Sequence, residues 1–286
     1  MLHLIFLFSL AIIWIFFATI QDLRTKEIAN WLNFSLIIFA LGFRFFFSLF
    51  SDNFSLFYQG LIGLAIFFVI GNLFYYGKFF AGGDAKLMIA LGAILPISDN
   101  LLQNLRFFGF FVISFFIIGA MYTLISSILL SFMNFNNFKK EFLHLLKKNK
   151  KIVYFSFLFS FFLILLGFFE KSLFILFLIP LFLCQLYIYI KAVDESCLVK
   201  TVSTNKLTEG DWLYRDVKLK RGLIKANWGG LRKEDIIKIK KEKKRVKIRE
   251  GIAFSPVFLI AFIIFIFIIF LGLFENFWSF LRNSLW

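Results

Sequence analysis

Long apolar segments alternate with short polar ones along most of the chain. Eight of them resemble membrane-spanning helices, which need about 20 mostly apolar residues to cross the hydrocarbon core. They cover residues 2–20, 31–50, 56–76, 84–98, 107–133, 152–169, 172–191 and 252–273. The fourth segment is shorter than most of the others and begins directly after two glycines. The pattern predicts an all-α polytopic membrane protein with about eight transmembrane helices.

One stretch, residues 194–250, has the composition of a water-soluble protein, with 17 basic and 9 acidic residues. Within it, Val217 and Leu219 alternate with polar neighbours, as do Val246 and Ile248. Such alternation is typical of half-buried strands, and the residues between the two pairs have the spacing of a short helix. We therefore predict a small cytoplasmic α+β module, inserted before the last helix and too small to be stable without support.

These patterns divide the chain into five parts. They are a membrane core of five spans, a basic interfacial loop, two further spans, the basic α+β module, and the last span with a short tail: 1–133, 134–151, 152–191, 192–250 and 251–286. Apolar residues recur near helical spacing within the interfacial loop, so it is either a helix on the membrane surface or a basic linker. Gly60, Gly63 and Gly71 in the third span favour close helix packing.

The composition excludes several classes of protein. Hydrophobic residues make up 60% of the 286-residue chain and charged residues 17%, and the mean hydropathy is +0.85. These values exclude a soluble globular enzyme, a disordered chain and a secreted disulfide scaffold. Cys184 and Cys197 are 13 residues apart, and His3 and His144 are isolated. We therefore expect no metal centre, no cofactor and no Ser-His-Asp triad.

The charge pattern predicts an orientation in the membrane. One set of loops holds 28 of the 32 Lys and Arg residues and 13 of the 17 acidic residues. The positive-inside rule places that face in the cytoplasm and both termini outside, in a plasma membrane. The net charge of +15 then reflects topology and attraction to an anionic inner leaflet, so no nucleic-acid partner is required.

Two carboxylates lie at helix ends on the predicted cytoplasmic face. Asp22 ends the first apolar segment and Asp84 begins the fourth, so the topology brings both to one depth. Such a pair suits an aspartic protease. The ionised acid takes a proton from the attacking water while the protonated acid stabilises the oxyanion. The alternative is structural: Asp22 flanks a helix end, and Asp84 favours the positive N-terminus of its helix.

The sequence around both acids is similar to that of a known family. Residues 22–32, DLRTKEIANWL, resemble the first active-site segment of the prepilin and preflagellin peptidases, which are GxGD-type membrane aspartic proteases. Residues 81–87, AGGDAKL, resemble the second active-site segment. The resemblance covers about residues 1–130. In addition, residues 207–213 and 249–256 resemble the extended C-terminal region of archaeal members.

The chain departs from the family pattern at two positions. Ala29 stands where proline is usual, and Ala81 where the first glycine of GxGD is common. Bacterial bifunctional members carry a cysteine-rich segment between the first two helices and N-methylate the new N-terminus. Here about ten residues join these helices, and none is cysteine. The resemblance therefore implies an archaeal-type peptidase without methyltransferase activity.

The resemblance implies that Asp22 and Asp84 form the catalytic pair. It also implies the substrates: prepilin-like or archaellin-like precursors, cut at the cytoplasmic border between a short basic leader and a hydrophobic helix. Gly82 and Gly83 let a substrate backbone pass close to Asp84, since neither has a Cβ atom. The competing hypotheses are a non-catalytic membrane assembly or transport component, and a presenilin-type protease that cuts within helices.

Three further residues are candidates for positioning. Thr25 either hydrogen-bonds near Asp22 or caps a helix, and Asn30 either orders the loop or caps the second span. Lys86 either biases the ionisation of Asp84 or anchors the topology.

The predicted module carries a second acidic group, formed by Glu209, Asp211 and Asp216. Three carboxylates could hold a divalent metal or receive the basic leader of a substrate. Scattered surface carboxylates among basic residues are the commoner arrangement.

Overall fold

The structure, a computed structural model, describes residues 2–171, 173–220, 222–227, 229–275 and 279. The chain forms two compact units. The first comprises residues 1–123 and 253–286, and the second comprises residues 124–252. Helix α5 belongs to the first unit up to Thr123 and to the second from Leu124.

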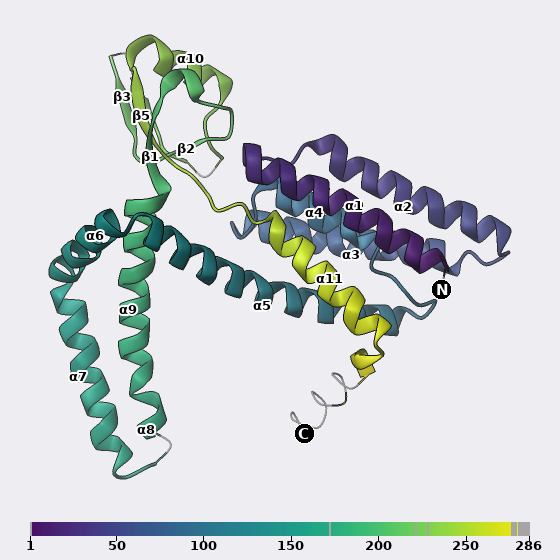
Figure 1. The fold of residues 1–286 in the computed structure, drawn as a ribbon, viewed down its shortest axis with the longest axis horizontal. Coiled ribbons are helices and arrows are strands. Elements are labelled where there is room, and N and C mark those ends of the chain that lie inside the picture. The colour runs from purple at the N-terminus through teal and green to yellow at the C-terminus, as the bar shows by residue number, and fades with distance from the viewer. Residues whose placement is uncertain (1, 172, 221, 228, 276–278, 280–286) are drawn as a thin grey trace. The chain divides into compact units, whose positions relative to one another are not determined.

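The first unit is built from apolar helices. They are α1 (Leu2–Thr25), α2 (Asn30–Phe50), α3 (Ser55–Tyr76), α4 (Gly82–Gly92), the first part of α5 (Leu101–Met133) and α11 (Ser255–Phe270). Helix α1 packs against both α2 and α11, and α4 packs against α2 and α3 (Figure 1). This packing sets the C-terminal end of α1 and the N-terminal end of α4 in one unit with the start of α11.

Helices α3 and α4 approach one another through small residues. A Cβ on Gly63 would clash with the carbonyl oxygen of Gly92, and a Cβ on Gly92 would lie 2.6 Å from the carbonyl oxygen of Gly63. A Cβ on Gly71 would lie 2.9 Å from the carbonyl oxygen of Ala85. The prediction that the glycines of the third span permit close packing is therefore confirmed for Gly63 and Gly71. A Cβ on Gly60 would instead meet the Arg44 side chain, at 2.6 Å.

A single buried arginine ties α2 to the segment that follows α4. The Arg44 side chain is 1% exposed. Its guanidinium donates hydrogen bonds of 2.6–3.1 Å to the carbonyl oxygens of Leu56, Ala93, Ile94 and Pro96. A buried guanidinium is costly unless its donors are paired, and here backbone carbonyls pair them.

The second unit contains the remaining helices: α6 (Phe135–Lys148), α7 (Lys150–Gly167), α8 (Leu173–Leu176) and α9 (Leu178–Val193). Figure 1 shows α7 and α9 side by side. The predicted interfacial loop is the helix α6. Its apolar residues pack against α9 in one cluster, formed by Phe138, Phe142, Leu145, Leu146, Val153, Cys184, Ile188 and Ala192. The apolar face of α6 is thus partly covered by α9: Leu145 is buried, whereas Phe135 and Leu143 are exposed.

The module after α9 is α+β, as predicted. Strands β1 (Val199–Ser203), β5 (Arg245–Arg249) and β2 (Trp212–Leu213) form an antiparallel sheet in the order β1-β5-β2. Strands β3 (Val217–Leu219) and β4 (Gly222–Ile224) form a hairpin, and α10 spans Lys233–Glu242. Buried residues from the strands and α10, among them Leu213, Ile224, Ile239, Val246 and Ile248, form its core. A π-helical turn, Asp194–Leu198, leads from α9 into β1.

The count of eight spans is not confirmed. Among the described residues, five helices have the length and hydropathy to cross a membrane: α1, α2, α3, α5 and α7. The other three predicted spans are shorter helices. Helix α4 has 11 residues and α11 has 16, and the seventh segment is divided into α8 and α9. The hydrophobic pattern overestimated the lengths of these helices, because apolar residues continue beyond the helix ends. Residues 93–96, which are buried and follow α4, are an example.

Candidate active site

Asp22 lies in the last turns of α1 and is buried, with 7% of its surface exposed. Its Oδ2 accepts a 3.1 Å hydrogen bond from the backbone N–H of Ser255, the first residue of α11. Helix α1 ends three residues later at Thr25. The next residue, Lys26, adopts a positive φ of 60° and donates its N–H to the Asp22 carbonyl oxygen. This left-handed residue reverses the chain so that the following loop returns toward α2.

The loop between α1 and α2 is fixed by side-chain contacts. The side-chain oxygen of Gln21 accepts a 3.1 Å hydrogen bond from the N–H of Ala29. Proline, the usual residue at this position in the family that the sequence resembles, has no N–H to donate, so this contact accompanies the alanine. Thr25 donates its hydroxyl to the carbonyl oxygens of Gln21 and Glu27, and its described hydrogen bonds include none to Asp22.

Asp84 is the third residue of α4 and is also buried, with 9% exposed. Its charge interacts with that of Asp22. A carboxylate at this position is stabilised by the positive end of the helix. The two acids are therefore electrostatically coupled and both withdrawn from solvent, although they are 62 residues apart in the sequence.

The two glycines before Asp84 have different surroundings. A Cβ on Gly83 would lie 3.1 Å from the Cβ of Ile28, whereas a Cβ on Gly82 would meet nothing closer than Tyr75 at 3.7 Å. The carbonyl oxygen of Gly83 also lies 3.5 Å from the side-chain amide of Asn33. Gly83 thus lets the start of α4 fit against the loop that follows Asp22, while Gly82 leaves open space.

Asn30 and Lys86 are brought together. The Lys86 ammonium donates a 2.6 Å hydrogen bond to the side-chain oxygen of Asn30. Helix α2 has Ala29 at its N-cap and no side-chain cap, so the interpretation of Asn30 as the cap of this helix is wrong. The contact instead joins α2 to α4.

Sequence reasoning missed two residues that contact this region, Ser255 and Asn33. The sequence indicates Ser255 only as part of the 249–256 segment, although the following Pro256 is typical of a helix start. Asn33 gave no signal, because a single amide in an apolar helix has no pattern of its own.

The second acidic group does not converge in the structure. Glu209 forms an exposed ion pair with Lys233, Asp211 accepts the N–H of Thr208, and Asp216 accepts the N–H of Ala226. The described residues hold no group of three or more His, Cys, Asp or Glu side chains that could bind a metal ion. Asp211 and Asp216 therefore stabilise turns of the module.

A different polar cluster lies where α9 meets the module. Arg249 forms a 2.9 Å ion pair with Asp194, and the Tyr214 hydroxyl donates to Glu195. Burial raises the pKa of Asp194, which Arg249 counteracts, and the hydrogen bond to Glu195 raises the pKa of Tyr214. This accounts for Tyr214 as a structural residue.

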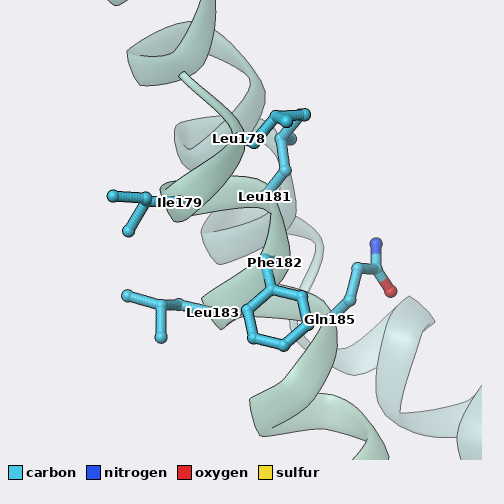
Figure 2. A pocket seen from close by; sticks show the side chains of 6 residues that line it. All are labelled: Leu178, Ile179, Leu181, Phe182, Leu183 and Gln185. Carbon is cyan, nitrogen blue, oxygen red and sulfur yellow. The ribbon is translucent and has the colours of Figure 1, made fainter. Parts of the chain in front are cut away.

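The pocket in Figure 2 is an apolar groove of about 530 Å³ along α9. It is lined by Leu178, Ile179, Leu181, Phe182, Leu183 and Gln185. None of these is a candidate site residue.

Apolar helices of spanning length define a multi-pass membrane protein. Residues 9–135 match the model of the type IV leader peptidase family. The matched region contains both Asp22 and Asp84, whereas Ser255 lies outside it.

Three curated relatives are preflagellin peptidases. The protein of Methanococcus maripaludis is 28% identical over 42% of this chain and 55% of its own length. The protein of Methanocaldococcus jannaschii is 32% identical over 31% of this chain and 38% of its own length. The protein of Methanococcus voltae is 25% identical over 46% of this chain and 58% of its own length. The chain thus spans about half the length of the curated relatives it matches. No solved structure matches the chain.

Proposed function

We propose that the protein is a membrane aspartic endopeptidase that removes the signal peptide from archaellin-like or prepilin-like precursors. The observation that carries this proposal is the coupling of two buried carboxylates, Asp22 at the end of α1 and Asp84 at the start of α4. The similarity to preflagellin peptidases supports the same conclusion. The proposed protease needs no cofactor, because the two acids supply the general base and the general acid.

The two acids divide the chemistry between them. Two carboxylates that are close together and withdrawn from water share one proton, since ionising both is unfavourable. The ionised member takes a proton from water, which attacks the peptide carbonyl. The protonated member donates to the developing oxyanion, and the leaving amine then receives a proton. Asp22 accepts a hydrogen bond from the Ser255 N–H.

The proposed site lies at the cytoplasmic membrane border. This orientation rests on the concentration of 28 of the 32 basic residues on one set of loops, and it leaves both termini outside. A precursor with a short basic leader and a hydrophobic helix presents its cleavage site at the same depth. Anionic lipid of the inner leaflet is the expected neighbour of the basic module.

The test is co-expression of the full chain with a tagged precursor that has a basic leader followed by a hydrophobic helix. Mass spectrometry then reads the size of the product and its new N-terminus. Cleavage between leader and helix is the expected result. Cleavage inside the helix would instead identify an intramembrane protease. No cleavage by a correctly inserted protein, across several such precursors, would favour a non-catalytic assembly or transport role.

A further inference from the structure

The start of α11 contacts the proposed catalytic pair directly. Ser255 and Asp22 are separated by 233 residues, yet the N–H of Ser255 donates to the Asp22 carboxylate at 3.1 Å. Both residues are buried, with Ser255 fully so and Asp22 7% exposed. A hydrogen bond to a buried carboxylate is stronger than one in water and favours its ionised form.

The backbone around Ser255 is held from both directions by first-unit helices. The Tyr122 hydroxyl on α5 donates a 3.0 Å hydrogen bond to the carbonyl oxygen of Ala253. The Thr19 hydroxyl on α1 lies 3.4 Å from the carbonyl oxygen of Ser255. These contacts fix the direction of the Ser255 N–H, so the hydrogen bond to Asp22 is supported by its surroundings.

An aromatic cluster completes this support. The ring of Phe254 packs against the rings of Phe80 and Phe115, with centroids 6.2 and 5.8 Å apart. Phe80 immediately precedes the Ala81-Gly82-Gly83 segment that leads to Asp84. The residue before Ser255 therefore packs against the residue that precedes the Asp84 segment, and the start of α11 lies near the surroundings of both acids.

We propose that Ser255 is a positioning residue of the active site, whose backbone N–H orients the Asp22 carboxylate for the attack of water. The inference rests on the proposed function. Residues 9–135, which match the family, would then hold both acids but lack the group that orients one of them. The N-terminus of α11 supplies that group from the far end of the chain.

The alternative is that Asp22 merely stabilises α11 as a helix-end carboxylate. A purely structural contact would reduce the amount of folded protein and scale all activities by the same factor. An orienting contact alters how the active site ionises. The pH profile of kcat/KM distinguishes the two, because loss of a hydrogen bond to the ionised carboxylate moves the acid limb to higher pH.

The decisive variant is Ser255→Pro, which removes the N–H. Proline is tolerated at the first position of many helices, where the N–H has no partner within the helix. Here Phe254 has an αR backbone (φ −103°, ψ −13°), which a following proline disfavours, so insertion of this variant is measured first. We expect kcat/KM to fall by about 10- to 100-fold, the range for losing a hydrogen bond to a charged group, and the acid limb to move upward. Lys233→Pro, a proline at the first position of α10, is the matched control and should leave the profile unchanged.

Ser255→Ala separates the backbone from the side chain. The Ser255 hydroxyl is buried and has no hydrogen-bond partner in the described part of the chain, so alanine removes it without breaking a contact. Alanine keeps the N–H, and we expect the acid limb to stay at the wild-type pH. A shift with alanine as large as with proline would overturn the backbone assignment.

None of these variants changes another charged residue near the site. Asp84 and Lys86 stand on α4 and Arg24 in the last turn of α1, while the first turns of α2 and α11 carry no charged residue. If Ser255→Pro fails to insert, Tyr122→Phe loosens the same segment and should shift the limb in the same direction, by less.

Wild-type cleavage measured beside the variants separates the two claims. An inserted Ser255→Pro protein with a wild-type profile, or an unchanged Tyr122→Phe profile where the proline variant does not insert, overturns the role of Ser255 alone. Absence of wild-type cleavage overturns the proposed function, and with it the inference.

Discussion

The Lys86 ammonium and the side-chain oxygen of Asn30 form a 2.6 Å hydrogen bond that joins the start of α4 to the start of α2. Asn30 follows the loop after Asp22, and Lys86 follows Asp84 by two residues. The bond therefore links the two segments that carry the proposed catalytic acids. Both side chains are partly accessible to water, so we infer a supporting role in aligning these segments.

Lys86→Met is expected to lower cleavage by less than about tenfold, because an accessible hydrogen bond contributes roughly 0.5–1.5 kcal/mol. Asn30→Asp keeps an acceptor for the ammonium and should retain near-wild-type activity. Initial rates on the tagged precursor measure both. A loss with Lys86→Met as large as that of an Asp84 variant would contradict a supporting role.

Gly83 and Gly82 should respond differently to alanine. Gly83→Ala places a Cβ 3.1 Å from Ile28 and forces the start of α4 away from the loop after Asp22, at a cost of roughly 1–3 kcal/mol. Gly82→Ala meets nothing closer than 3.7 Å and gains helix propensity. We expect reduced cleavage for the first variant and near-normal cleavage for the second. Equal loss in both would show that the open space at Gly82 is itself needed, for example by the substrate.

Arg44→Met should destabilise the first unit. It removes the donors for four buried or partly buried backbone carbonyls, and the expected loss of stability is roughly 3 kcal/mol or more. The midpoint of thermal unfolding in detergent measures the effect. Arg106→Met, at an exposed position on α5, is the control and should change the midpoint little. Similar midpoints for both variants would refute the structural role of Arg44.

Cleavage should depend on pH with a maximum between two limbs. One acid of the pair must be ionised and the other protonated, so activity falls at low pH, where both are protonated, and at high pH, where both are ionised. The profile of kcat/KM on the purified protein measures the two limbs. A single limb over the accessible range would contradict a shared proton.

The sequence was informative wherever a local pattern carries the structure. Alternation at Val217 and Leu219, and at Val246 and Ile248, predicted β3 and β5, because burial on one face of a strand leaves a period of two. The positions of Asp22 and Asp84 at helix ends followed from the hydrophobic boundaries. The aspartate pair itself stays a prediction, which cleavage by variants must test.

Long-range contacts were beyond the sequence. Nothing near Ser255 indicates a partner 233 residues away. Likewise, nothing near Arg44 indicates that its guanidinium donates hydrogen bonds to carbonyl oxygens after α4. Such pairings depend on how helices pack, which a periodic pattern does not encode. The same limit applies to α6, for which the sequence allows a membrane-surface helix or a linker, because its packing against α9 has no local signature.

The most direct test of the account compares wild type with Asp22→Asn and Asp84→Asn on one tagged precursor, with insertion verified for each protein. Asp52→Asn is the matched control, since Asp52 is exposed and has a positive φ that asparagine also adopts. We predict wild-type cleavage for the control and a loss of about 100-fold or more for each of the other two variants. Undiminished cleavage by an inserted Asp22→Asn or Asp84→Asn protein would contradict the catalytic pair.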